Sequence, residues 1–144
     1  MRTIDMAGIY TLTIVKPDAF GSGKAGNILA HLEAEGFQLA AVRVIHLKKS
    51  QAEKFYAVHR DRPFFDSLVG FMTSGRCMPM LLKRDDAVAH LRLVIGATDP
   101  AEADEGTVRA LYAEDKERNA IHASDSDANA RIETAFFFEG VELL

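Results

Sequence analysis

The hydrophobic residues of this chain are grouped in short segments, and the spacing within each segment predicts its secondary structure. β-Branched and apolar residues predict a buried strand over residues 9–15. Alternating apolar positions predict a second strand over 37–47, pairing with the first, and a third over 77–82. Pro79 lacks a backbone N–H, which places the third strand at a sheet edge or a bulge. A short apolar pair predicts a fourth strand that ends at His122.

The segments between these strands have apolar residues three or four positions apart, which is the spacing of helices. One predicted helix follows a glycine-rich loop and ends at Gly36, which stands where a C′ residue belongs. The stretch Ser50–Glu53 has the form of a capping box and predicts a helix beginning at Gln51. Pro63 suits a first helical turn and predicts another helix, which ends near Gly75.

Two further helices complete the pattern. Asp85-Asp86 can cap a helix that Gly96 closes. Residues 124–126 are all good N-cap types, and the final helix is expected to run from them to Phe138. Its predicted apolar face consists of Ile132, Ala135 and Phe136, with Glu133 next to that face.

The resulting order is strand, helix, strand, helices, strand, helix, strand, helix. This order predicts an α+β fold with a split β-α-β arrangement, in which helices cover one face of a small antiparallel sheet. A doubly wound parallel sheet is the alternative, which the short spacings disfavour without eliminating. The length of 144 residues suggests a single domain over 1–144 that can bury a substantial core.

The composition, with 48% hydrophobic and 26% charged residues, is that of an ordinary soluble globular protein. The formal net charge of −4 argues against nonspecific coating of nucleic acid, and no specific nucleic-acid partner is expected. Cys77 is the only cysteine, which excludes a disulfide framework and a thiolate metal cluster. Since the chain also lacks a signal-peptide pattern and an apolar run of membrane-spanning length, we expect a cytoplasmic protein without a membrane partner.

The stretch Asn119–Ser126 carries the first candidate chemistry. It places His122 just before N-cap residues, so the imidazole is expected to face the N-terminus of the final helix. Backbone N–H groups at that end attract anions, and an imidazole nitrogen is a nucleophile. A histidine packed beside a well-capped helix accounts for the same residues, and the stretch alone does not separate the two interpretations.

Other candidate ligand contacts are ambiguous by themselves. No Gly-Lys-Ser/Thr follows the glycines of 21–26 at the Walker spacing, so a phosphate loop of that type is rejected. Helical spacing favours the core for Phe65, whereas Phe64 abuts a loop and suits a ligand equally well. Arg92 lies beside the apolar stripe of its helix, where a solvated charge is the simpler interpretation before context is added.

Seven motifs occur in order along the chain and are specific only when they are taken together. They are Val15-Lys16-Pro17-Asp18, Tyr56, Asp61-Arg62-Pro63-Phe64-Phe65, Thr73-Ser74-Gly75, Gly96-Ala97-Thr98-Asp99-Pro100, Gly106-Thr107-Val108-Arg109 and Asn119-Ala120-Ile121-His122-Ala123-Ser124-Asp125-Ser126. With these motifs in register, the chain resembles the nucleoside diphosphate kinase family from Tyr10 to Phe138.

The resemblance implies a ferredoxin-like βαββαβ fold with a four-stranded antiparallel sheet, and a homo-oligomer that is a tetramer or a hexamer. It also implies transfer of the γ-phosphate of a nucleoside triphosphate to a nucleoside diphosphate, with broad base specificity. Such enzymes work by a ping-pong route through a phosphohistidine, with Mg²⁺ on the nucleotide phosphates. The implied partners are therefore nucleoside di- and triphosphates.

The resemblance also assigns roles position by position. It matches His122 to the phosphorylated histidine. Asn119, together with Lys16, matches the residues that address the ribose hydroxyls, and Phe64 and Leu68 match the apolar clamp on the base. The residues matched to phosphate contacts are Lys16, Arg62, Arg92, Thr98 and Arg109. Those matched to holding the histidine and its surroundings are Tyr56, Ser124 and Glu133.

These residue types suit the implied chemistry. A neutral imidazole is a competent nucleophile, and Glu133, eleven residues after His122, can fold back along the last helix to hold one tautomer. Phosphoryl transfer needs positioning and charge stabilisation, which three arginines, one lysine and Mg²⁺ can supply to a nucleotide polyphosphate. The sequence offers no carboxylate pair or His/Cys cluster for a dedicated metal site, so the metal is expected to arrive with the nucleotide.

Three places depart from the family's commonest pattern. Ala123 stands where glycine is usual, Glu117 where glycine is frequent, and Ala110-Leu111 replaces Gly-Asp or Ala-Asp. We expect these changes to adjust the rate or the loop packing and not to abolish activity.

Two competing hypotheses remain to be weighed. An inactive nucleotide-binding scaffold of the same fold would have lost a key side chain, yet all those matched above are present. The basic residues between Arg43 and Arg62 suggest nucleic-acid binding, but a solvated face plus the phosphate site explains them better in an acidic chain.

Overall fold

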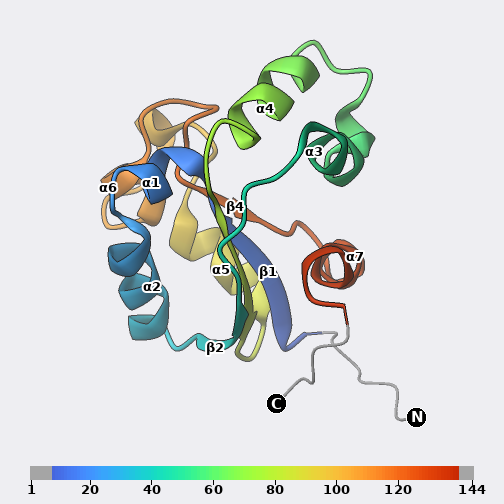
Figure 1. Ribbon diagram of the computed structural model, residues 1–144. Coiled ribbons are helices and arrows are strands. Elements are labelled where there is room, and N and C mark those ends of the chain that lie inside the picture. The colour runs from blue at the N-terminus through green and yellow to red at the C-terminus, as the bar shows by residue number, and fades with distance from the viewer. Residues whose placement is uncertain (1–7, 140–144) are drawn as a thin grey trace, which may run out of the picture.

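The structure, a computed structural model that describes residues 8–139, is built on one four-stranded antiparallel sheet (Figure 1). The strands are β1 (Tyr10–Val15), β2 (Gln38–Val42), β3 (Met78–Lys83) and β4 (Ile121–Ala123). Their order across the sheet is β2-β3-β1-β4, and every neighbouring pair is antiparallel. The α+β, ferredoxin-like βαββαβ fold is thereby confirmed, and the parallel doubly wound alternative is wrong.

Helices and short 3-10 turns connect the strands. In chain order they are α1 (Pro17–Gly21), α2 (Ala25–Ala34), α3 (Lys49–Phe55), η1 (Ala57–His59), α4 (Phe65–Met72), α5 (Ala87–Ile95), η2 (Pro100–Glu102), α6 (Val108–Tyr112) and α7 (Asp127–Phe137). None of the helices within residues 8–139 combines the length and the apolar character needed to cross a bilayer.

The core has two layers, one on each face of the sheet, because β1 is buried along its whole length. Ile28 of α2 and Leu91 of α5 belong to the cluster on one face. Val69 of α4 and Phe137 of α7 belong to the cluster on the other face, where α3 also packs (Figure 1). The expectation that helices cover only one face is therefore wrong: the alternate side chains of β1 demand a partner on both sides.

The predicted pairing of the first two strands is also wrong, because β3 lies between them. β1 instead pairs with β3 and β4, so it occupies the centre of the sheet. The prediction that Pro79 marks a sheet edge fails as well. Pro79 faces Ile14 of β1 on one side, and its carbonyl accepts a hydrogen bond from the Arg43 N–H on the other. The register shift lies on β2 between Leu39 and Ala41.

The starts of two helices differ from the predictions by two residues. α3 begins at Lys49, because the Gln51 side chain accepts a hydrogen bond from the Lys48 N–H at 2.9 Å. The helix expected from Pro63 begins at Phe65. The buried face of α7 consists of Ala130, Thr134 and Phe137, whereas Ile132 is 67% exposed, so the predicted apolar face is wrong.

Gly96 ends α5 in a backbone conformation, with φ 87° and ψ −178°, that is essentially restricted to glycine. A Cβ atom built there would lie 2.6 Å from Thr107 Oγ1 and 2.8 Å from Thr107 Cβ. Thr107 cannot yield easily because its hydroxyl caps α6, accepting from the Ala110 N–H and donating to the Asp104 carbonyl. The close contact thus joins the end of α5 to the start of α6.

We predict that Gly96→Ala lowers the free energy of unfolding by at least about 2 kcal/mol, since backbone strain and the clash with Thr107 add. Gly106→Ala is the matched control, because Gly106 also has a positive φ (86°) but has no atom within 4 Å of the added Cβ. That variant should lose only about 1 kcal/mol. Urea unfolding of both variants measures the difference, and equal losses would contradict the proposed clash.

Candidate active site

His122 lies in the middle of β4, opposite Ile14 of the central strand. The Thr13 hydroxyl donates a hydrogen bond to the His122 carbonyl at 2.6 Å, which fixes the backbone that carries the imidazole. The side chain is 18% exposed. His122 is therefore rigidly mounted while its ring remains accessible.

Glu133 reaches His122 from α7. Its Oε1 atom lies 2.6 Å from His122 Nε2 and also accepts a hydrogen bond from the Ser124 hydroxyl at 2.9 Å. Ser126 caps α7, because its hydroxyl accepts from the Asn129 N–H, so the helix starts where the sequence predicts. When Nε2 donates its proton to this carboxylate, Nδ1 carries the lone pair, and no described residue forms a hydrogen bond with it. The contact therefore leaves Nδ1 as the ring nitrogen with an available lone pair.

Aromatic rings pack around the imidazole. The ring of Phe55 meets it edge-on with centroids 5.4 Å apart, and the ring of Tyr56 does so at 6.2 Å. The Tyr56 hydroxyl is buried and has no hydrogen-bond partner among residues 8–139. Burial raises the pKa of this hydroxyl, with smaller contributions from Cys77 and Glu133. Tyr56 thus stays neutral, and its ring packs against that of His122.

Lys16 lies directly after β1 and is only 7% exposed. Its Nζ donates a hydrogen bond to Asn119 Oδ1 at 2.7 Å, and the Asn119 amide donates to the Thr98 carbonyl at 3.2 Å. Burial, followed by the charge of Arg109, lowers the pKa of the Lys16 amine to about 8. Lys16, Asn119 and Thr98 are thereby joined into one hydrogen-bonded set.

Arg109 projects from α6 between two other elements. It donates to the Gly96 carbonyl at 3.1 Å and to the Ile121 carbonyl at 2.8 Å, one residue before His122. Burial and then the charge of Arg92 lower the pKa of its guanidinium to about 10, so it remains cationic at neutral pH. Its Nε atom is buried without a described partner.

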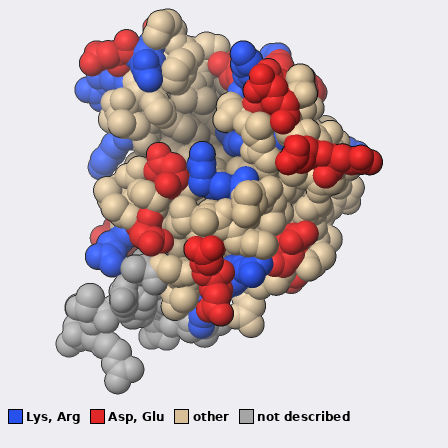
Figure 2. All heavy atoms as spheres, turned by 180° about the vertical axis from the view of Figure 1, so that it is seen from behind, with Lys and Arg blue, Asp and Glu red and all other residues tan. Residues whose placement is uncertain are grey.

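Arg92, Thr98 and Arg109 line the same concavity, of about 320 Å³, at the end of α5. Seen from behind, lysine and arginine side chains lie beside a hollow in the surface, and acidic side chains project around it (Figure 2). This electrostatic arrangement suits a bound anion that enters between the elements carrying the cations.

The other matched residues lie on α4 and the turn before it. Phe64 is the N-cap residue of α4 and is 45% exposed, while Phe65 is buried, as the helical spacing predicted. Leu68 is half-buried in the next turn, and Arg62 is exposed. The Phe64 ring lies 5.4 Å from the ring of His59, which in turn stacks on Tyr56, so this wall meets the aromatic residues around His122.

Asp18 is a supporting residue that sequence reasoning did not single out. Its Oδ2 atom accepts a hydrogen bond from the Ala120 N–H at 3.0 Å, and the Ala120 carbonyl accepts from the Lys16 N–H at 2.9 Å. Ala120 has a φ of 72°, which is unusual for a residue other than glycine. The position of Asp18 directly after Lys16-Pro17, in one of the seven motifs, was the available signal.

Ala123, which replaces the usual glycine, lies in β4 opposite Thr13 and is not among the non-glycine residues of positive φ. Its extended backbone therefore does not require glycine. Within residues 8–139, no three His, Cys, Asp or Glu side chains gather in a group that could hold a metal ion.

Comparison with known proteins identifies the family of this chain. Residues 10–143 match the family described as nucleoside diphosphate kinase. The nucleoside diphosphate kinase of Chlorobium chlorochromatii is 56% identical over 134 residues, which cover 93% of this chain and 96% of that protein. That of Sorangium cellulosum is 53% identical over 138 residues, 96% of each chain.

Solved structures give the same result. A crystal form of the Aquifex aeolicus nucleoside diphosphate kinase has a TM-score of 0.91 at 44% identity, covering 94% of this chain and 98% of its own. The halophilic nucleoside diphosphate kinase of Halobacterium salinarum, in complex with CDP, has a TM-score of 0.89 at 37% identity, covering 94% and 90%. Motifs, fold and relatives together show that this chain belongs to the nucleoside diphosphate kinase family.

Proposed function

We propose that this chain transfers the γ-phosphate of a nucleoside triphosphate to a nucleoside diphosphate, with His122 as the covalent carrier. The observation that supports this role most directly is the 2.6 Å contact between His122 Nε2 and Glu133, which leaves Nδ1 as the nucleophile. In the first half-reaction Nδ1 attacks the γ-phosphorus, the bond to the β–γ bridging oxygen breaks, and the nucleoside diphosphate leaves. In the second, a different diphosphate attacks the phosphohistidine and restores the free imidazole.

The surrounding residues have distinct proposed roles. Lys16, Arg62, Arg92, Thr98 and Arg109 contact the phosphates, and the cations among them stabilise the charge that spreads over the moving phosphoryl group. Lys16 and Asn119 contact the ribose hydroxyls. Glu133 stabilises the imidazolium that phosphorylation creates, while Tyr56 and Ser124 hold the ring and the carboxylate in place.

The base is proposed to lie against Phe64 and Leu68. A ring that is 45% exposed offers a stacking surface, and any base has a complementary π-face. The relative from Halobacterium salinarum was solved with CDP. We therefore propose broad base specificity, with nucleoside di- and triphosphates as the partners. An inactive scaffold would have lost one of the key side chains. His122, Lys16 and Glu133 are all present, so the described residues give that alternative no support.

Mg²⁺ is proposed to enter as part of the nucleotide complex. Oxygen ligands are what this ion prefers, and the β- and γ-phosphates supply them. Asp125 lies three residues after His122. The Asn129 side chain donates a hydrogen bond to its carboxylate and lowers its pKa, which favours the ionised form. When bound, the ion would neutralise phosphate charge alongside the arginines.

The assembly is proposed to be a homo-oligomer of single-domain chains, a tetramer or a hexamer, in the cytoplasm. β2 is an edge strand, and Val42 and Val44 on and after it are 45% and 51% exposed. An edge with exposed apolar side chains is well suited to pairing with another chain. The molecular mass of the assembly in solution distinguishes the tetramer, the hexamer and the monomer.

We predict that incubation with γ-labelled ATP attaches phosphate to the protein, that the bond is acid-labile and base-stable, and that added diphosphate removes the label. His122→Ala should take up none, because it lacks the nucleophile. His31→Ala, which changes a histidine in α2 on the far side of the core, should be labelled like the wild type. A wild-type protein that takes up no label would refute the proposed function.

Glu133→Gln should slow labelling by roughly ten- to a hundredfold, because it replaces a charge-assisted hydrogen bond to Nε2 with a neutral one. The KM for ATP should change little, since Glu133 contacts the imidazole and not the nucleotide. Rapid-quench labelling measures the rate. Glu139→Gln, which removes an exposed carboxylate after α7, is the control, and equal slowing in both variants would point to a general charge effect.

The value of kcat/KM for the diphosphate should fall as pH rises above about 8. The Lys16 amine has a pKa of about 8, so it is cationic below that pH and loses the charge that attracts the nucleotide above it. Lys16→Met should start from a lower kcat/KM and show no such fall. If both proteins lose activity in parallel over this range, the titrating group is not Lys16.

A further inference from the structure

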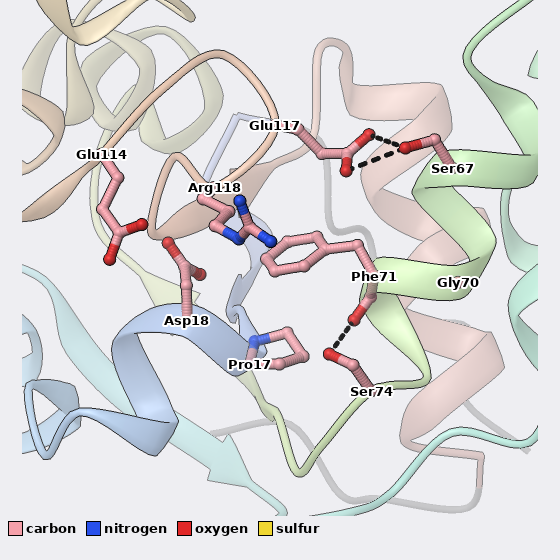
Figure 3. Close-up of a pocket in the computed structure, with 9 residues that line it drawn as sticks. All are labelled: Pro17, Asp18, Ser67, Gly70, Phe71, Ser74, Glu114, Glu117 and Arg118. Carbon is pink, nitrogen blue, oxygen red and sulfur yellow. Dashed lines mark hydrogen bonds between the residues drawn. The ribbon is translucent and has the colours of Figure 1, made fainter.

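A hydrogen bond joins α4 to the loop before β4, at the rim of a cavity of about 440 Å³ (Figure 3). The Ser67 hydroxyl on α4 lies 2.8 Å from Oε2 and 3.0 Å from Oε1 of Glu117. Figure 3 shows the two side chains facing each other from the helix and the loop. Glu117 therefore connects two parts of the chain that have no other described side-chain hydrogen bond to each other.

These two parts are the walls of the proposed nucleotide site. Ser67 is one residue before Leu68 and three after Phe64, the proposed contacts of the base. Glu117 is two residues before Asn119, which holds Lys16 for the ribose. The charge of Glu117 raises the pKa of the Lys16 amine, against the larger effect of burial, so the carboxylate is within electrostatic reach of that amine. Glu117 thus lies between the ribose contacts and the base contacts.

The carboxylate of Glu117 has acceptor capacity to spare. Ser67 supplies a single proton, whereas two carboxylate oxygens can accept about four. No Lys, Arg or His within residues 8–139 forms an ion pair with Glu117. An ionised acceptor without a cationic partner, placed beside a base, favours a base edge that presents adjacent donors.

We propose that Glu117 biases the site toward guanine nucleotides, within the broad base specificity of the proposed function on which this inference rests. Guanine presents N1–H and the exocyclic N2 amino group side by side, so one carboxylate can accept from both. Thymine and uracil present carbonyl oxygens on either side of a single N–H, and a carboxylate repels those oxygens. Adenine and cytosine, each with one amino group, should rank between the two.

The test separates base choice from phosphohistidine formation. Each protein is first labelled with γ-labelled ATP and freed of nucleotide, and the labelled protein is then mixed with GDP or with TDP. The second-order rate constant of label removal is measured for each diphosphate. We expect the GDP-to-TDP ratio of the wild type to exceed that of Glu117→Gln by roughly tenfold, because the amide keeps one acceptor and replaces the other with a donor.

Glu114→Gln is the matched control, since it makes the same charge change on the same loop and should leave the ratio at the wild-type value. A ratio that is the same in the wild type and Glu117→Gln overturns the proposal, as does an equal shift in Glu114→Gln. Equal slowing with both diphosphates in Glu117→Gln also overturns it, because it reveals a structural role alone. If the wild type takes up no label, the proposed function itself fails; label uptake with an unshifted ratio removes only the guanine preference.

Discussion

The contact between His122 and Glu133 is the constraint on which the rest of the site depends, because it decides which imidazole nitrogen keeps an available lone pair. A three-residue strand supplies the histidine and an eleven-residue helix supplies the carboxylate. The central strand aligns both: Ile14 pairs with His122, and the Leu12 carbonyl accepts from the Ser124 N–H. A one-residue slip of β4 would turn the imidazole to the opposite face of the sheet.

The cations of the site are held by neutral groups. Asn119 accepts from Lys16, and two backbone carbonyls accept from Arg109. Within residues 8–139 neither cation forms an ion pair with a carboxylate. No direct ion pair therefore occupies either cation, and both are available to a polyphosphate. Burial lowers the pKa of both groups, and the charges of Asp18 and Glu117 offset part of this effect on Lys16.

Sequence patterns predicted the element types well and the pairing of strands poorly. The residues at which β1 and α5 end were predicted correctly from Pro17 and Gly96, because each of these residues restricts the backbone at its own position. Strand order depends on contacts between distant segments, so apolar alternation did not reveal that β3 separates β2 from β1. Of the site, the contact between His122 and Glu133 was expected from the family resemblance, and the eleven-residue spacing along the last helix agreed with it. The role of Asp18 was not, because it acts through the backbone of Ala120, which no side-chain pattern records.

The left-handed conformation of Ala120 has a consequence for engineering this chain. Such a backbone costs an alanine about 1–2 kcal/mol, and a search for heat-resistant variants would therefore substitute glycine. Yet the methyl group is fully buried, and hydrogen bonds on both sides of the residue hold Asn119 and Ile121 in register. Glycine would relieve the strain and at the same time loosen the backbone that holds His122 in place. Thermal resistance is better sought at exposed positions far from this loop.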